Sequence, residues 1–276
     1  MSESSNSKIL YKLDRVGADV EVFLRDIATG KPVPVIGLIG GTKENPKPVP
    51  ELGKGFCVQE DNVMLEYNIP PAKTQAQLVQ NIMTMNNYLQ QLLFSQGLRY
   101  DICESMIFTP NQLAHPQAES IGCEPDYDVW HRLINPTPKN NPLLANTRTS
   151  GGHVHISFKV RGKVPAFDDI FIREPVVKAC DITIGFPLLF KFPNSKRRQL
   201  YGKPGAFRKK VYGIEYRVPD NQWTRTAEDV AWIWTGIEKA FHLVNNYSEL
   251  MNDLNTDILN LVSYVPSNIE KAQEYA

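Results

Sequence analysis

The stretch GGHVHIS, residues 151–157, alternates strictly between polar and apolar side chains. His153, His155 and Ser157 share one phase, and the aliphatic residues between them share the other. A period of two predicts a half-buried β-strand, because successive side chains of a strand point to opposite faces of its sheet. The polar face of this strand would carry two imidazoles and a hydroxyl, which are groups that coordinate ligands.

Three other stretches repeat this alternation: GADVEV at 17–22, VMLEYN at 63–68 and GIEYRV at 213–218. Each places charged side chains within an otherwise apolar run. The charged positions are Asp19, Glu21, Glu66, Glu215 and Arg217. If the four strands share one sheet, its polar face gathers four acids, two histidines and one arginine.

Taken singly, each of these motifs is more typical of a solvated sheet face. Together they need a compensating charge, because two carboxylates about 5 Å apart repel by roughly 3 kcal/mol at an effective dielectric of 20. Arg217 can offset one acid but not four. Carboxylates and neutral imidazole are ligands of divalent metals, so this face predicts a metal or ligand site. Relief of like charges further implies that loss of Glu215 would cost little stability.

The composition sets broad limits on the class of protein. The chain has 276 residues, 42% of them hydrophobic, which is enough for a sizeable core, and its formal net charge of zero argues against a dedicated nucleic-acid binder. Four widely spaced cysteines form no zinc-ligand pattern and are typical of reduced thiols in the cytoplasm. No signal peptide and no apolar run approaching about 18 residues is visible, so we expect no membrane partner and a cytoplasmic location.

The order of the predicted elements favours an α+β fold: a mainly antiparallel sheet with a polar active-site face and helices packed on its other face. Residues 1–10 are expected to be a disordered tail, and 11–276 a single domain because no linker divides them. Helices are predicted to start at Thr74, at Asp168 or Asp169, at Thr224 or Thr226, and at about Asp253, the last of them ending near Tyr264. The second helix is expected to end near Gly185, before Pro187.

Two charged segments lie between these elements. GGTKENPKP at 40–48 lacks the spacing of a phosphate-binding P-loop, and we expect a surface loop, with the alternative that Lys43 lies near an anionic substrate. Residues 194–212 contain seven lysines and arginines and are expected to form a loop. That loop is either a solvated charged segment or a phosphate clamp, since the planar guanidinium group suits phosphate oxygens.

Together, these motifs resemble the glutamine synthetase and glutamate–cysteine ligase superfamily, and more closely the small phage-type carboxylate–amine ligases (COOH-NH2 ligase type 2, or amidoligases). The resemblance covers about residues 15–245. Its carriers are GADVEVF, GLIGGTKENP, NVMLEYNIPPA, GCEPDYDVW, RTSGGHVHISF, RRQLYGKPGAFRKK and GIEYRVPDNQW. The most specific matches are HVHIS and IEYRVPD, which are similar to H-x-H-x-S and I-E-V-R-F-P-D of glutamine synthetase. The resemblance implies a sheet like that of the glutamine synthetase catalytic domain.

The resemblance implies two metal sites on the polar face. Asp19, His153 and Glu215 would hold one Mg²⁺ or Mn²⁺ ion that bridges the nucleotide phosphates. Glu21 and Glu66 would hold the other ion.

The third acid of the second site is open. The position that matches the superfamily's acid is Gln59, and Glu60 lies next to it. The resemblance also implies that His155 and Ser157 contact the nucleotide. Phosphate or a substrate carboxylate would be bound by three arginines: Arg198, Arg208 and Arg217.

The implied activity is that of an ATP-dependent ligase joining a small-molecule or peptide carboxylate to an amine. Transfer of the γ-phosphoryl group would give an acyl phosphate, which the amine attacks to form an amide. Arg217, Arg208 and Glu66 are the expected catalytic residues, and Glu66 or Glu21 would be the general base. Whether the chain forms a homo-oligomer stays open. Its location would be the host cytoplasm if a phage encodes the chain.

Two other classes of protein also stay open. A metal-dependent hydrolase or oxygenase could use His153 and His155 on one metal, without a nucleotide. A non-catalytic phage or scaffold protein could keep the same fold. The joint presence of the acids, His153 and Arg217 argues against a dead site, since drift would be expected to remove at least one of them.

Overall fold

A computed structural model describes residues 9–119, 126–138, 140–162, 170–193 and 196–247. The expected disordered tail lies outside these residues except for Ile9 and Leu10, and Leu10 already belongs to the first strand. The expected caps Asp168 and Asp169 and the expected last helix from about Asp253 also lie outside them.

Eleven strands form one antiparallel sheet. They are β1 Leu10–Asp26, β2 Pro32–Val33, β3 Lys47–Pro48, β4 Cys57–Asp61, β5 Met64–Asn68, β6 Leu98–Asp101, β8 Tyr127–Asp128, β9 Leu133–Ile134, β11 Gly152–Arg161, β12 Ala206–Lys210 and β13 Gly213–Tyr216. Their order is β3-β4-β5-β1-β11-β13-β12-β8-β9, with β2 and β6 also paired to β1. Two further strands, β7 Ser105–Ile107 and β10 Thr147–Thr149, pair with each other. The four predicted polar strands are therefore the neighbours β5, β1, β11 and β13.

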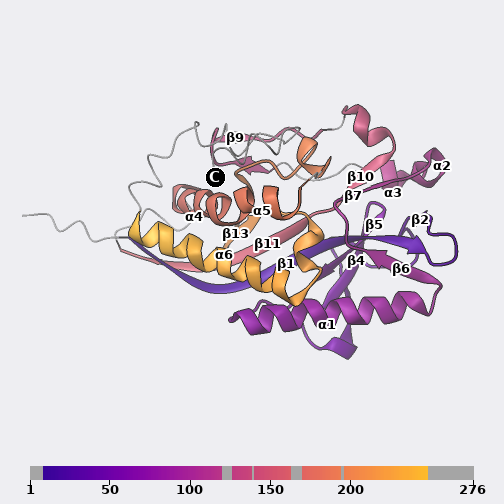
Figure 1. Cartoon of the computed structure of the whole chain (residues 1–276), viewed down its shortest axis with the longest axis horizontal. Helices are drawn as coiled ribbons and strands as arrows, with labels where there is room; N and C mark the ends of the chain where they lie inside the picture. The colour runs from indigo at the N-terminus through magenta and orange to yellow at the C-terminus, as the bar shows by residue number, and fades with distance from the viewer. Residues whose placement is uncertain (1–8, 120–125, 139, 163–169, 194–195, 248–276) are drawn as a thin grey trace, which may run out of the picture.

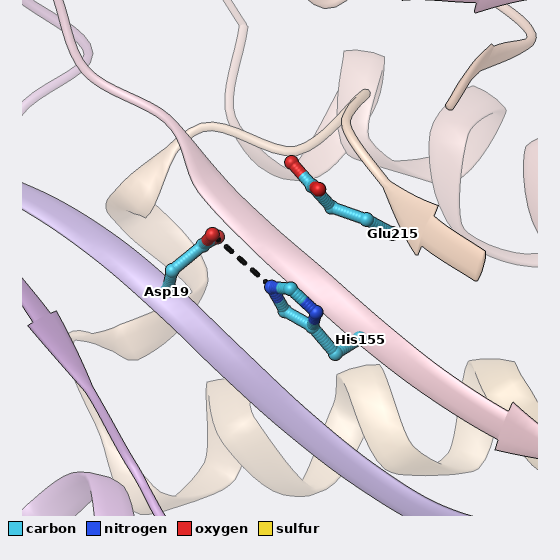
Figure 2. Close-up of side chains that lie close together, drawn as sticks. All are labelled: Asp19, His155 and Glu215. Atoms are coloured by element: carbon cyan, nitrogen blue, oxygen red, sulfur yellow. Dashed lines mark ion pairs between the residues drawn. The ribbon is translucent and has the colours of Figure 1, made fainter. Parts of the chain in front are cut away.

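The predicted division of these strands into an apolar and a polar face is confirmed. Val20 of β1, Ile156 of β11 and Ile214 of β13 are fully buried in the main core, which they share with helix residues such as Ile233. The acidic and imidazole side chains of the alternate phase project from the other face of the sheet, as Figure 2 shows for Asp19.

The helices are α1 Gln75–Phe94, α2 Pro110–Leu113, α3 Pro116–Glu119, α4 Glu174–Cys180, α5 Phe186–Lys191 and α6 Ala227–Asn246. The two long helices begin as predicted, because the hydroxyls of Thr74 and Thr226 accept hydrogen bonds from backbone N–H groups of the first turn. α6 packs against α1, α4 and β1, as Figure 1 shows along the sheet. This arrangement confirms the predicted α+β class. No helix in the described part of the chain combines the length and apolar surface that a bilayer crossing requires.

One extra residue in β1 decides which of its side chains are buried. Asp14 is inserted between Leu13 and Arg15, whose partners on β11 are consecutive residues. Before this bulge the odd-numbered Tyr11 is in the core, and after it the even-numbered Val16 and its successors are. The bulge therefore turns the odd-numbered acids of β1 toward the polar face.

The predicted helix end before Pro187 is wrong. α4 continues through a π-helical turn, Asp181–Gly185, directly into α5, and Pro187 is the second residue of α5. The wider hydrogen-bond spacing of the π-turn interrupts the regular ladder at this point. Proline then falls in the first turn of a new helix, where a missing N–H is tolerated.

The prediction of a loop over 194–212 is wrong in part. Lys196–Gln199 forms a short 3-10 turn, η5, and Ala206–Lys210 forms β12. β12 pairs with β13, so that Arg208 lies opposite Glu215. The AFRKK sequence of β12 has no clear polar alternation, and its strand structure follows from pairing with its neighbour.

Gly152, at the start of β11, lies where a side chain cannot fit. A Cβ atom there would be 2.5 Å from the carbonyl oxygen of Asp220 and 2.7 Å from Nε1 of Trp223. We expect Gly152→Ala to lower the free energy of unfolding by about 1–3 kcal/mol, because neither backbone nor a buried indole can move aside cheaply. Urea denaturation measures this change.

Gly17→Ala is the matched control, since a Cβ at Gly17 has no neighbour closer than 3.6 Å. Replacing a glycine inside a strand should leave stability unchanged or raise it by about 0.5 kcal/mol. Equal losses in both variants would contradict the steric explanation.

Candidate active site

The register of the sheet brings the polar residues into adjacent rows on one face. The four central strands contribute to these rows through directly opposed pairs. The pairs are Asp19 with His153, His155 with Glu215, and Glu21 with Glu66. Residues predicted from four separate stretches of sequence therefore meet in space.

Asp19, His155 and Glu215 form a first group of ligand atoms. The nitrogen and carboxylate oxygens that they offer lie within 4.8 Å of one another, and they come from β1, β11 and β13 (Figure 2). Nε2 of His155 is 3.1 Å from Oδ2 of Asp19, and its Nδ1 contacts the hydroxyl of Tyr212. Burial lowers the pKa of His155, but Asp19 and Glu215 outweigh burial and raise it.

His153 lies between this group and an arginine. Its Nδ1 is 3.0 Å from Oδ1 of Asp19 and 3.8 Å from Oε1 of Glu215. Nη1 of Arg217 is 3.2 Å from the same nitrogen. Burial and Arg217 lower the pKa of His153 to about 4, so the imidazole is neutral near pH 7. The predicted ligand His153 thus adjoins the group that His155 completes.

Three cations surround the carboxylate of Glu215. Nζ of Lys210 is 2.7 Å away, Nη1 of Arg208 is 3.3 Å away, and Arg217 forms an ion pair with the same carboxylate. Burial and Asp19 raise the pKa of Glu215, but the neighbouring cations outweigh them and lower it to about 2. Loss of Glu215 would deprive the buried Arg217 of a carboxylate partner, which reverses the expectation of a small stability cost.

Glu21, Asp61 and Glu66 form a second group, whose carboxylate oxygens also lie within 4.8 Å of one another. The sequence left the third acid of this group open, with Gln59 at the matching position and Glu60 next to it, and the structure brings Asp61 to Glu21 and Glu66. Asp61 is two residues beyond Gln59 and shares its face of β4, because side chains alternate along a strand. That spacing is the sequence signal that would have identified it.

The second group carries negative charge that its neighbours only partly offset. Burial and Asp61 raise the pKa of Glu21 to about 7. Burial, Asp19 and Asp61 raise the pKa of Glu66 well above its usual value. These carboxyl groups consequently bind protons near neutral pH unless a bound cation replaces the protons.

A cavity of about 130 Å³ is lined by the whole second group and by Asp19 of the first. The cations lining it are Lys43, Arg148, Arg197, Arg208 and Arg217. Arg197 is among the lining residues and the predicted Arg198 is not. Successive residues of a 3-10 turn point about 120° apart, so only one of the two arginines can face the cavity.

A larger cavity of about 390 Å³ adjoins the first group through His155. The predicted nucleotide contacts His155 and Ser157 both line it, together with the ring of Tyr212. The remaining lining residues are Asp14, Arg15, Gly17, Ala18, Asn68, Ile69 and Pro71. This cavity combines apolar surface with a few polar groups, as small-molecule sites commonly do.

The donor atoms of both groups fit a divalent cation. Carboxylate oxygens, with an imidazole in the first group, suit Mg²⁺ or Mn²⁺. Oδ1 of Asp19 is buried and makes no hydrogen bond within the described part of the chain, although Nδ1 of His153 lies 3.0 Å away. An orphaned acceptor beside acids with raised pKa values is the arrangement that a bound cation would stabilise.

Comparison with protein-family models gives no match for this chain, and comparison with curated proteins gives no similar protein. The geometry of the site is therefore the ground on which a function is assigned.

The raised pKa of Glu21 makes stability depend on pH. The unfolded chain releases this proton at a pKa of 4.5 and the folded chain at about 7, so folding loses stability as the pH rises through that window. Glu21→Gln should raise the free energy of unfolding of the metal-free protein by up to about 3 kcal/mol at pH 8 and change it little at pH 4. Denaturation with a chelator present measures both values, with the exposed Glu51→Gln as control. The same effect at both pH values would contradict this origin.

Proposed function

We propose that the chain is an ATP-dependent ligase that uses Mg²⁺ or Mn²⁺ to form an amide bond between a carboxylate and an amine. The observation that carries the proposal is the pair of adjacent ligand groups on one sheet face, with arginines lining the same cavity. The sequence resemblance to phage-type carboxylate–amine ligases supports the same class.

The nucleotide is proposed to place its base in the larger cavity. His155, Ser157 and Tyr212 line that cavity and offer hydrogen-bonding groups and an aromatic ring. His155 also belongs to the first ligand group, so the phosphates would leave the base cavity beside Asp19. Its size and its position next to the acids support this orientation.

Each of the two ligand groups would hold one divalent ion. The first ion would be bound by Asp19, His155 and Glu215, with His153 beside them. The second ion would be bound by Glu21, Asp61 and Glu66. Bound Mg²⁺ or Mn²⁺ would neutralise charge on the transferring phosphoryl group. Arg208 and Arg217 line the same cavity and would hold phosphoryl oxygens with their forked donors.

The proposed reaction has two steps. A carboxylate oxygen of the donor attacks the γ-phosphorus of ATP, the bond to the bridging oxygen breaks, and ADP leaves. The amine nitrogen then attacks the acyl carbon, phosphate departs, and the nitrogen loses a proton. Glu66, or Glu21 beside it, is the proposed base, because both carboxylates line the cavity that would hold the phosphorylated carboxylate.

The substrates are proposed to be small molecules or peptide groups, because the cavity over the ligand groups has a volume of only about 130 Å³. We place the activity in the cytoplasm, where ATP is abundant. The free thiols of Cys57, Cys103 and Cys180 agree with that location.

A nucleotide-independent metalloenzyme is the second candidate. Nδ1 of His153 and Nε2 of His155 lie 3.0 and 3.1 Å from the two oxygens of Asp19. Two histidines and one carboxylate form the ligand set of many non-haem iron oxygenases. Nucleotide dependence separates this candidate from the ligase.

Calorimetry with a non-hydrolysable ATP analogue tests the proposal. We expect binding in the presence of Mg²⁺ or Mn²⁺ and none with a chelator. Asp19→Asn should weaken metal-dependent binding by about tenfold or more, because it removes a charge from the first group while keeping the side-chain shape. Glu238→Gln on the exposed side of α6 is the control and should bind like the wild type.

A second assay measures release of ADP from ATP in the presence of different carboxylates and amines. We expect release only when both a suitable carboxylate and a suitable amine are present. Metal binding without nucleotide binding would refute the ligase and favour the metalloenzyme. Binding of neither metal nor nucleotide would refute both candidates.

A further inference from the structure

We propose that Lys43 binds the terminal phosphate of the nucleotide, at the end of the site that lies over Glu21, Asp61 and Glu66. The inference rests on the proposed ligase function and adds a residue to it. Lys43 lies on the loop between β2 and β3, for which the sequence left a plain surface loop and an anion contact as alternatives.

Glu60 of β4 holds the base of this loop. Its Oε2 accepts a hydrogen bond of 2.9 Å from the N–H of Gly37, and its Oε1 accepts bonds of 2.9 and 2.8 Å from Ile39 and Gly40. The side chain of Ile39 is buried in the main core, and Nζ of Lys47 donates to its carbonyl oxygen at 3.0 Å. Charge-assisted bonds and a buried anchor thus fix a segment that runs over the surface.

The next residues are fixed as well. Gly41 has a φ of +84°, and a Cβ there would lie 2.7 Å from the carbonyl oxygen of Val58, so the backbone passes close against β4. Thr42 and Asn45 exchange backbone hydrogen bonds of 3.1 Å in both directions. Lys43 is therefore presented from a closed turn on an anchored loop.

The side chain of Lys43 lines the smaller cavity beside Asp61. Burial raises the pKa of Asp61, and Lys43 is the neighbouring charge that opposes this rise most strongly. Even so, Lys43 makes no hydrogen bond or ion pair with any residue that the structure describes. Its ammonium group is thus close to the acids and free to bind a ligand.

The other cations of the cavity are already engaged by the protein. Arg208 and Arg217 form ion pairs with Glu215. Arg148 and Arg197 donate hydrogen bonds to backbone carbonyl oxygens. Among the residues that the structure describes, Lys43 therefore differs from them in having no partner to give up when an anion arrives.

The order of groups along β1 indicates which anion Lys43 meets. Gly17 lines the larger cavity, Asp19 belongs to the first ligand group and Glu21 to the second. Four residues of extended strand, about 13 Å, separate Gly17 from Glu21. A nucleotide with its base in the larger cavity would lay its phosphates along this path, so that the phosphate farthest from the base reaches Lys43. A lysine ammonium is a common phosphate ligand.

Calorimetry on the full chain with Mn²⁺ compares ADP with a non-hydrolysable ATP analogue. We expect Lys43→Ala to weaken binding of the analogue by about tenfold or more and to leave ADP binding unchanged, because only the analogue has the terminal phosphate. Lys43→Arg should restore most of the loss. Lys54→Ala is the matched control, since Lys54 is exposed and lies outside both cavities.

Glu60→Ala tests the loop separately from the charge. Like Lys43→Ala, it should weaken binding of the analogue and leave binding of ADP unchanged, because it removes the acceptor of the three N–H groups that hold the loop. Equal losses for ADP and the analogue in Lys43→Ala, or no loss for either, would overturn the role of Lys43 while leaving the ligase proposal standing. A wild-type chain that binds neither nucleotide would overturn the proposed function, and this inference with it.

Discussion

The crowding of carboxylates on one face of the sheet is the constraint on which the rest of the site depends. Burial makes each negative charge costly, and the chain meets that cost in two different ways. Around Glu215, arginines and a lysine hold the carboxylate ionised. Around Glu21 and Glu66 such pairing is scarce, and the pKa values of these acids rise instead. The first group is thus charged at neutral pH, whereas the charge of the second depends on what binds there.

Much of this arrangement could be read from the sequence, because alternation along a strand decides which side chains share a face. That rule placed Asp19, Glu21, Glu66, His153 and Glu215 on the polar face, and all five lie beside the cavities or in the ligand groups. It did not reveal Asp61, since the triplet 60–62 also has the composition of a turn. The structure extends β4 through Asp61 and so adds this acid to the site.

Other features depend on contacts that no local pattern encodes. The presence of His155 in the first group follows from the pairing of β11 with β13, which sets His155 directly opposite Glu215. Arg197 faces the cavity in place of Arg198 because of the direction in which a short turn is wound. Neither register nor turn orientation can be derived from the order of residue types alone.

The bulge at Asp14 shifts the alternation of buried and exposed side chains along β1 by one residue. Upstream of it, a change of length would alter only the edge where Tyr11 packs against the core. Downstream, one inserted or deleted residue would replace the acids on the polar face by their apolar neighbours Ala18, Val20 and Val22. Insertions and deletions should therefore be tolerated before Asp14 and not after it. The site depends on the register of β1 as much as on the identity of its side chains.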